Sequence, residues 1–186
     1  FVFALHGRAP GTATGIKRGL SNKGVVFTLQ GDGDLAAIGL GDILSAVNRG
    51  EKLTTIFFNN AGYGTTGGQM APTTLQGQVT TTSPEGRDPA QHGYPVHMAE
   101  LMASMRGVAY SARVALTDLK NFVKAKRAVK TAFQKQIDKV GFSFLEILSA
   151  CPPDWHMTPV EALKWIDEKM IPEYPLGEFK NVDKIE

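Results

Sequence analysis

The sequence predicts an α/β fold, with a mostly parallel sheet and helices on both of its faces. Short apolar runs rich in β-branched residues alternate along the chain with longer segments of helical periodicity. Parallel strands joined by helices produce this alternation. Turns rich in glycine, aspartate and asparagine follow the first two predicted strands. These turns stand at the carboxyl ends of the strands, where open sheets of this class bind ligands.

The first predicted unit is a strand, a helix and a second strand. Residues 25–30 form an apolar run between glycines, which is typical of a strand buried on both faces of a parallel sheet. Residues 36–48 place apolar side chains on one side of a helix. Residues 53–58 are again apolar and lead directly into Asn59 and Asn60. A right-handed crossover between the two strands is expected.

The middle of the chain contains a long segment without periodicity. Residues 61–95 are rich in Gly, Thr, Pro and Gln, and a loop of this length is usually functional or disordered. Residues 98–105 then indicate a short helix, and residues 108–115 indicate a strand. The alternation of strand and helix therefore resumes after the loop.

A helix and a strand are predicted next. Asp118 is a suitable N-cap for a helix that ends at Ile137, and residues 142–149 read as the last strand. The helix carries its large apolar residues on one predicted face, with Lys and Arg opposite: Leu119, Phe122, Val129, Phe133 and Ile137.

The carboxyl-terminal part predicts one further helix. Thr158 and Glu161 have the spacing of a capping box, which opens a helix through about residue 169. Residues 172–186 read as a polar tail. Residues 1–186 are expected to form a single domain. The chain opens at Phe1 without a Met, so we expect it to be part of a longer polypeptide.

Composition excludes several classes of protein. The 186 residues carry a formal charge of +2, which does not indicate nucleic-acid binding. The sequence has no apolar run of about 18 residues, so no membrane span is predicted, and it shows no signal peptide. The single cysteine excludes an internal disulfide and is compatible with a reducing cytoplasm. A cytoplasmic location is therefore expected.

The two turns after the first strands combine residues suited to a metal and a diphosphate. Glycines such as Gly31 and Gly33 let the backbone approach a phosphate closely, and amides at a helix start donate to it. Asp32, Asn60 and a nearby carbonyl offer the oxygen ligands that Mg²⁺ takes beside phosphate oxygens and water. The alternative interpretation is a tight turn and a chance asparagine pair.

The same glycines also fit a dinucleotide-binding fingerprint. Glu51 lies twenty positions after Gly31, as a ribose-binding acid should. In that fold, however, the acid stands at the end of the second strand. Glu51 precedes the predicted second strand, so a nicotinamide site is disfavoured.

The pattern Gly-Asp-Gly, then 25 residues, then Asn-Asn resembles the thiamine diphosphate signature of thiamine-dependent enzymes. Longer segments narrow the resemblance to the beta subunit of 2-oxoacid:ferredoxin oxidoreductases, over most of the chain. Among these relatives the branched-chain type acting on 2-oxoisovalerate is most similar, followed by the 2-oxoglutarate type. The segments that carry the resemblance are HGRAP (6–10), QGDGDLAAIG (30–39), GGQMAPTT (67–74) and TTTSP (80–84).

The resemblance implies a set of binding residues. Asp32, the Asn60 side chain and the Gly62 carbonyl would hold Mg²⁺. The loop that follows would close over thiamine diphosphate, although a merely flexible glycine loop is the alternative. The residues implied in cofactor binding are Gly31, Asp32, Gly33, Asp34, Asn60, Tyr63, Gly64, Thr65 and Thr66. No catalytic residue is assignable, because the glutamate that activates thiamine comes from another chain or domain in this family.

Three further residues are candidates of a weaker kind. His6 and Arg8 could face substrate or cofactor, or be ordinary surface residues. In the family, a cysteine at the position of Cys151 binds a four-iron cluster, whose other cysteines lie in an amino-terminal segment absent here. Because a cluster needs several thiolates, this chain is not expected to hold it alone. The alternative interpretation of Cys151 is a small buried side chain without a ligand role.

The family implies oxidative decarboxylation of a 2-oxoacid to an acyl-CoA, with electrons passed through iron–sulfur clusters to ferredoxin. The expected partners are the alpha-type and other subunits of a hetero-oligomer, ferredoxin, the 2-oxoacid and coenzyme A, but neither nucleic acid nor membrane. Two alternatives stay open. One is another thiamine-dependent decarboxylase or synthase, and the other is a non-catalytic assembly module when the chain is isolated.

Overall fold

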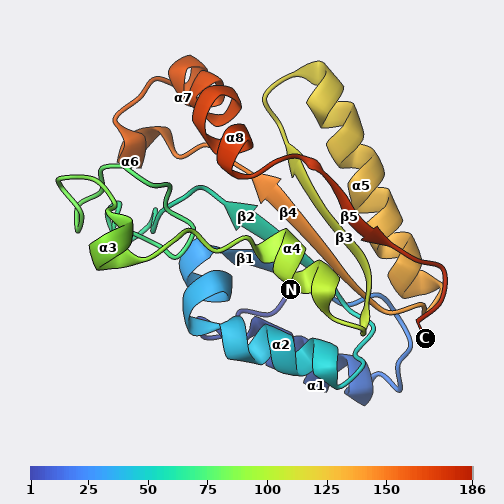
Figure 1. Cartoon of the computed structure of the whole chain (residues 1–186). Helices are drawn as coiled ribbons and strands as arrows, with labels where there is room; N and C mark the ends of the chain where they lie inside the picture. Colours follow the sequence, from blue (N-terminus) through green and yellow to red (C-terminus); the bar gives the residue numbers. More distant parts are fainter. Residues whose placement is uncertain (186) are drawn as a thin grey trace.

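The computed structural model describes residues 1–185 and contains one five-stranded sheet in the order β1-β2-β4-β3-β5. Four strands run parallel, and only the last is antiparallel to its neighbour β3 (Figure 1). The predicted α/β class and the mostly parallel sheet are confirmed. The strands are β1 (Phe27–Gly31), β2 (Thr54–Asn59), β3 (Val108–Ala115), β4 (Phe142–Leu148) and β5 (Gly177–Asn181).

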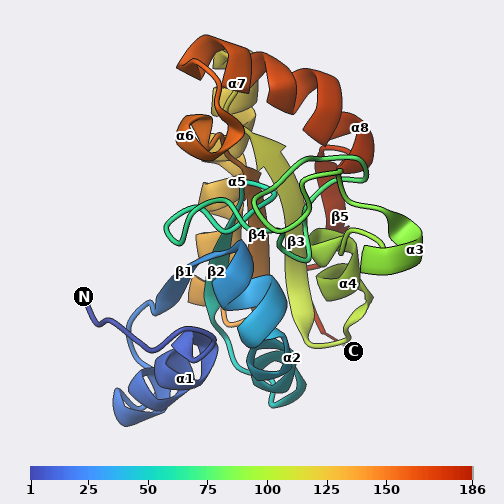
Figure 2. The ribbon, with the colours of Figure 1, turned by 90° about the vertical axis from the view of Figure 1, so that its left-hand side faces the viewer.

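Helices cover both faces of the sheet, as predicted. α5 (Leu119–Ile137) packs on one face, against Ile56 and neighbouring strand residues. The other face carries α1 (Ala9–Gly19), α2 (Leu40–Asn48) and α4 (Met98–Ser104), in a core that contains Phe57. Successive strand residues point to opposite faces, and Figure 2 shows these helices on either side of the strands.

Short helices and the long loop cover the carboxyl ends of β3 and β4. Here Leu148 and Ala115 pack against Ile166, Met170 and Tyr174. The carboxyl ends of β1 and β2 border the pocket described below. The covering elements are α3 (Pro89–His92), α6 (Pro152–Trp155), α7 (Pro159–Trp165), η2 (Ile166–Met170) and α8 (Ile171–Glu173).

Both predicted helix starts are confirmed. The Asp118 carboxylate accepts a hydrogen bond from the Asn121 amide at 2.6 Å, as an N-cap does. Thr158 and Glu161 form the reciprocal bonds of a capping box. The helix after Thr158 runs further than predicted, because η2 and α8 continue it to Glu173.

The predicted burial of the first strand is wrong. Phe27 and Leu29 are 47% and 46% exposed, whereas Thr28 and Gln30 between them are buried. The reason is that β1 is the edge strand and pairs only with β2. Its apolar side chains therefore point to an open side of the molecule.

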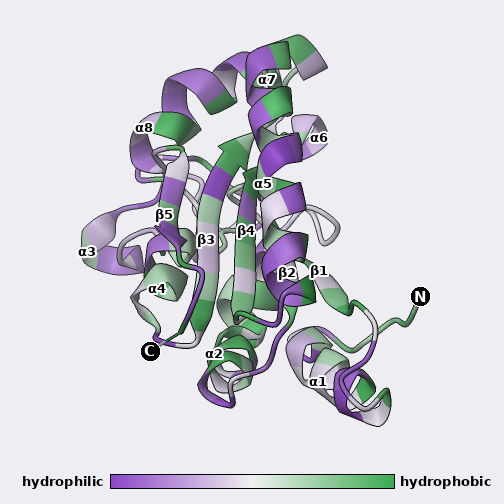
Figure 3. Ribbon diagram, turned by 90° about the vertical axis from the view of Figure 1, so that its right-hand side faces the viewer, coloured by the Kyte–Doolittle hydropathy of each residue, from purple (hydrophilic) through white to green (hydrophobic). Residues whose placement is uncertain are grey.

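The apolar face predicted for the long helix is buried only in part, because Val129 and Phe133 pack against the core but the other three residues do not. Leu119, Phe122 and Ile137 are 78%, 53% and 54% exposed. Small residues, Ala125, Ala128 and Ala132, face the sheet instead. Figure 3 shows apolar and polar turns alternating along α5 beside strands β3 and β4.

Two boundaries differ from the sequence prediction. The helix predicted for residues 36–48 is two segments, a π-helix η1 (Gly33–Ile38) and then α2, with Gly39 between them. The predicted polar tail contains β5, so the strand over residues 142–149 is not the last one. None of the helices within residues 1–185 has the length and apolar character needed to cross a lipid bilayer.

Candidate functional site

A pocket with a cavity volume of about 600 Å³ opens at the carboxyl ends of β1 and β2. Its walls come from the turn after β1, the loop after β2 and the amino-terminal segment. Leu29, Ile38 and Phe58 form an apolar side, and the remaining lining is polar or glycine. All nine residues predicted to bind the cofactor line this pocket, together with Gly62 and His6: Gly31, Asp32, Gly33, Asp34, Asn60, Tyr63, Gly64, Thr65 and Thr66.

The three predicted metal ligands lie in contact with one another. The end of the Asn60 amide that faces them is 2.5 Å from Asp32 Oδ2 and 2.8 Å from the Gly62 carbonyl oxygen. With its nitrogen there, Asn60 donates both hydrogen bonds. With its oxygen there, the Asn60 Oδ1, the Asp32 Oδ2 and the Gly62 carbonyl oxygen lie next to one another, as the ligands of one metal ion would. Neighbouring ligands of an octahedral Mg²⁺, each about 2.0–2.1 Å from the ion, lie about 2.9 Å apart, so this donor set fits the ion.

Asp32 is almost completely buried, at 2% exposure. Its Oδ1 accepts a hydrogen bond from the Thr73 hydroxyl, and its Oδ2 accepts one from the backbone amide of Asn60 at 2.9 Å. Burial raises the pKa of Asp32 to about 7, against the lowering effect of these two hydrogen bonds. A bound cation would favour the ionised carboxylate that burial disfavours.

Packing within the chain itself requires glycine in the turn after β1. A Cβ on Gly33 would lie 2.6 Å from the Tyr63 ring, so only glycine fits beneath that ring. Gly33 also opens the π-helix η1, whose first amides lack acceptors within the helix. Helices of this kind are frequent at functional sites.

The loop after β2 forms a closed turn beside the pocket. Tyr63 and Gln69 form an isolated antiparallel bridge, in which the Tyr63 amide donates to the Gln69 carbonyl at 3.0 Å. The Thr66 hydroxyl donates to the Gln69 side chain at 2.6 Å. These bonds tie the loop to itself and disfavour the alternative interpretation of a merely flexible glycine loop.

The two amino-terminal candidates differ in their position. His6 lines the pocket with its side chain 83% exposed, and its Nδ1 is 3.8 Å from Asp34 Oδ1. Asp34 also accepts a hydrogen bond from the Gly7 amide. Arg8 is the N-cap of α1 and is absent from the residues that line the pocket. The structure thus brings His6 to the site and leaves Arg8 outside it.

Comparison with known proteins identifies the family. Residues 1–147 match the model described as "Thiamine pyrophosphate enzyme, C-terminal TPP binding domain". The chain belongs to this family of TPP-binding domains. Thiamine pyrophosphate is the other name of thiamine diphosphate, so the cofactor class predicted from the Gly-Asp-Gly and Asn-Asn turns is confirmed at the level of the family.

Curated relatives of the TPP-binding domain bear oxidoreductase and synthase names. This chain is 49% identical over 180 residues to ketoisovalerate oxidoreductase subunit VorA of Methanothermobacter marburgensis. The match covers 97% of this chain and 37% of that protein. This chain is 36% identical over 167 residues to 2-oxoglutarate synthase subunit KorB of Archaeoglobus fulgidus, covering 90% of this chain and 58% of that protein. The chain therefore spans between about a third and three fifths of the length of these relatives.

A solved structure shares the fold of the TPP-binding domain. It is the 2-oxoglutarate:ferredoxin oxidoreductase from Magnetococcus marinus, with 2-oxoglutarate, coenzyme A and succinyl-CoA bound. The match has a TM-score of 0.74 at 22% identity and covers 96% of this chain and 64% of that chain. At this identity the likeness establishes the fold alone.

Cys151 follows the residues that the family model matches, and it lies behind the loop and not in the pocket wall. A Cβ on Gly64 would be 3.4 Å from its Sγ. The thiol donates to Asp154 Oδ2 at 2.8 Å, and burial raises the pKa of Cys151. Within residues 1–185, no group of three or more His, Cys, Asp or Glu side chains is arranged to hold a metal. A cluster ligand role for Cys151 therefore stays a prediction about a larger assembly.

Sequence reasoning missed two residues that support the site. Thr73 holds Asp32, and buried Glu146 accepts a hydrogen bond from the Asn59 side chain at 2.7 Å. Asn59 Oδ1 in turn accepts from the Ala61 amide at 3.0 Å, which fixes the backbone around Asn60. Thr73 lies within the GGQMAPTT segment quoted above, but its contact with Asp32 depends on the folding of the long loop.

Proposed function

We propose that this chain binds Mg²⁺–thiamine diphosphate in the pocket at the carboxyl ends of β1 and β2. The observation that carries the proposal is the contact among Asp32 Oδ2, the Asn60 amide and the Gly62 carbonyl. One anionic and two neutral oxygens suit Mg²⁺, which keeps its other positions for phosphate oxygens and water. The membership in a family of TPP-binding domains supports the same conclusion.

The residues of this chain have distinct tasks in the proposed site. Asp32, Asn60 and Gly62 hold the metal, and the turn of Gly31, Gly33 and Asp34 lies against the diphosphate. Tyr63, Gly64, Thr65 and Thr66 close one side of the pocket. Leu29, Ile38 and Phe58 offer an apolar wall, and a bound cofactor would cover these exposed side chains.

When bound, thiamine diphosphate supplies a carbon nucleophile and an electron sink for decarboxylation of a 2-oxoacid. Among the described residues that line the pocket, none is a glutamate. We therefore assign the activating glutamate to a partner chain, as the family resemblance implies, and regard the isolated chain as a binding subunit of low or no activity.

We further propose that the chain is part of a 2-oxoacid:ferredoxin oxidoreductase. The reaction would convert a 2-oxoacid and coenzyme A to acyl-CoA and CO₂, releasing two electrons to ferredoxin and one proton. The relative named as a ketoisovalerate oxidoreductase subunit is 49% identical, against 36% for the 2-oxoglutarate synthase subunit. This difference supports 2-oxoisovalerate as substrate, with 2-oxoglutarate second.

The partners and location follow from the same proposal. The alpha-type and other subunits would complete a hetero-oligomer, and a four-iron cluster would form only there, with Cys151 as one ligand. His6 is the substrate-facing residue that the pocket favours. A reducing cytoplasm suits the cluster and the single cysteine.

Isothermal titration of thiamine diphosphate into the chain, with and without Mg²⁺, tests the binding proposal. We expect Mg²⁺-dependent binding that Asp32→Ala and Asn60→Ala abolish. Asp167→Ala and Asn48→Ala, at exposed positions outside the pocket, are matched controls and should leave affinity unchanged. Equal affinities in all variants, or no Mg²⁺ dependence, would contradict the assigned metal site.

Reduction of a redox dye by the reconstituted subunits tests the reaction. With 2-oxoisovalerate and coenzyme A, we expect dye reduction that requires both this chain and its alpha-type partner. Release of CO₂ without dye reduction would indicate the alternative, a thiamine-dependent decarboxylase that needs no electron carrier.

A further inference from the structure

The two oxygens of Asp32 have different partners. Oδ2 faces the Asn60 amide and the Gly62 carbonyl, so it is the oxygen available to a metal. Oδ1 points to the opposite side, where it accepts the hydrogen bond of the Thr73 hydroxyl. Thr73 is fully buried, at 0% exposure. Oδ2 also accepts a hydrogen bond from the backbone amide of Asn60 at 2.9 Å, and a carboxylate oxygen with one such bond keeps a second lone pair for a metal.

We propose that Thr73 is a positioning residue for the metal ligand Asp32, and that Tyr174, from the carboxyl-terminal segment, holds Thr73 in place. This inference rests on the proposed metal site and extends it to residues that do not line the pocket. A hydrogen bond at Oδ1 fixes the rotation of the carboxylate and leaves Oδ2 directed at Asn60 and Gly62.

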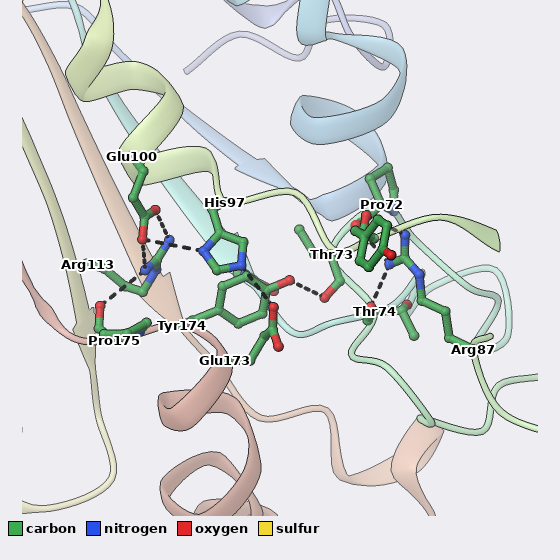
Figure 4. Close-up of polar contacts among 12 residues, drawn as sticks. Pro72, Thr73, Thr74, Arg87, His97, Glu100, Arg113, Glu173, Tyr174 and Pro175 are labelled. Carbon is green, nitrogen blue, oxygen red and sulfur yellow. Dashed lines mark hydrogen bonds and ion pairs between the residues drawn. The ribbon is translucent and has the colours of Figure 1, made fainter. Parts of the chain in front are cut away.

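The turn that carries Thr73 is clamped from two sides. The Tyr174 hydroxyl donates to the Thr73 carbonyl at 2.6 Å (Figure 4). The guanidinium of Arg87 donates to the carbonyls of Pro72 at 3.0 Å and Thr74 at 2.5 Å. The same guanidinium also donates to carbonyls of residues 92–94. Arg87 is 5% exposed, and its guanidinium binds backbone carbonyls of the loop rather than lining the pocket.

Tyr174 is itself fixed by neighbours from several elements. The centroid of its ring lies 5.0 Å from the centroid of the His97 ring. The Arg113 Cζ lies over the same ring, 5.1 Å from its centroid. His97 in turn pairs with Glu173, Nε2 to Oε1, at 2.9 Å. The tyrosine is fully buried. A chain of contacts therefore runs from α4, β3 and the segment after α8 through Tyr174 and Thr73 to the carboxylate of Asp32.

The physical consequence is a measurable effect on metal affinity at a distance. Groups that orient a metal ligand without touching the ion typically contribute about 10- to 100-fold to affinity. Without its Oδ1 partner, the Asp32 carboxylate would be oriented only by the hydrogen bond that the Asn60 backbone amide donates to Oδ2. We therefore expect the hydroxyls of Thr73 and Tyr174 to matter for Mg²⁺ affinity, although neither touches the pocket.

The first experiment measures Mg²⁺ affinity of the intact chain by titration at saturating thiamine diphosphate. Thr73→Val should weaken it about 10- to 100-fold, whereas Thr73→Ser, which keeps the hydroxyl, should stay within about threefold of wild type. Thr55→Val is the matched control, because Thr55 is equally buried and its hydroxyl bonds only Thr28, at 2.9 Å. A folded Thr73→Val with unchanged affinity, or a Thr73→Ser as weak as Thr73→Val, overturns the proposal.

The second experiment is a double-mutant cycle with Tyr174→Phe, which removes a single hydroxyl. Alone it should weaken Mg²⁺ affinity several-fold, and in the Thr73→Val background it should add nothing. Additive losses would overturn the role of Tyr174. Should Thr73→Val fail to fold, Tyr174→Phe decides by itself, since unchanged affinity refutes the coupling. Absence of Mg²⁺-dependent binding by the wild type would overturn the proposed site as well, so the two failures are distinguishable.

Discussion

At the scale of single residues, Asp32 sets the chemistry of the site. Its carboxyl is buried without a basic side-chain partner among the ion pairs of residues 1–185, whereas buried Glu146 is paired with Arg113. Burial therefore raises the pKa of Asp32 to about 7. The free chain holds a carboxyl that prefers to be neutral, and metal binding needs it ionised.

This conflict predicts a pH dependence of stability to which Asp32 contributes, as does Glu146, whose pKa burial also raises. A carboxyl whose folded pKa is raised stabilises the fold fully below its unfolded pKa, and this stability is lost as pH rises through the folded pKa. From the shift to about 7, the contribution of Asp32 to the unfolding free energy of the metal-free chain should fall by about 2–3 kcal/mol between about pH 5 and pH 8.

Urea unfolding of wild type and Asp32→Asn at the two pH values tests this prediction. Asp32→Asn should show a smaller decrease than wild type and be more stable than wild type at the higher pH, although it loses Mg²⁺ binding. Mg²⁺ with thiamine diphosphate should restore wild-type stability at the higher pH. Parallel pH profiles for the two proteins would show that another group is responsible.

At the scale of elements, α5 shows how packing overrides an apolar pattern. The helix contacts β3 and β4 through Ala125, Ala128 and Ala132, which let its axis approach the sheet closely. The larger Leu119 and Phe122 are left 78% and 53% exposed. Residue size therefore decides which side of the helix faces the sheet. The small alanines pack there, and Leu119 and Phe122 lie outside the core.

Substitutions on the two faces of α5 should have opposite consequences. Ala132→Leu inserts bulk into a closely packed contact and should cost about 1–3 kcal/mol. Phe122→Ser, on the exposed face, should change the unfolding free energy by less than about 0.5 kcal/mol. Urea unfolding measures both. If Phe122→Ser were the costlier change, the helix would be rotated relative to the structure.

At the scale of the whole molecule, Arg113 joins the sheet to its covering layers. Its side chain is fully buried and pairs with Glu146, Nε to Oε2, at 2.9 Å. It also bonds Glu100 of α4 and the Pro175 carbonyl, at 2.8 Å and 3.1 Å. Because Glu146 holds Asn59, the arginine links the carboxyl-terminal segment to the backbone beside the metal site.

Loss of the Arg113 guanidinium should destabilise the whole chain. Arg113→Met leaves Glu146 buried and unpaired, which typically costs about 3–5 kcal/mol. Lys164→Met is the control, because Lys164 and Glu168 form an exposed pair, 3.6 Å apart, whose loss should cost less than about 1 kcal/mol. Urea unfolding of both variants provides the comparison. Equal costs would mean that the buried pair contributes no more than a surface one.

The sequence, together with its resemblance to thiamine-dependent enzymes, was sufficient for the fold class and for the polar and glycine residues of the pocket. Glycine, aspartate and asparagine also serve in ordinary turns, but the carboxyl ends of parallel strands meet at one edge, where ligands bind. Spacing in the chain therefore translated directly into proximity in space. The helix starts at Asp118 and Thr158 were predictable for a similar reason, since capping is local.

Only the tertiary structure decided which faces are buried and what supports the site. The strand order makes β1 an edge strand, and the close packing of α5 selects alanines over larger residues. The contacts of Thr73 with Asp32 and of Tyr174 with Thr73 join residues 41 and 101 positions apart. Such contacts depend on the path of the long loop and of the carboxyl-terminal segment, and no local periodicity encodes that path.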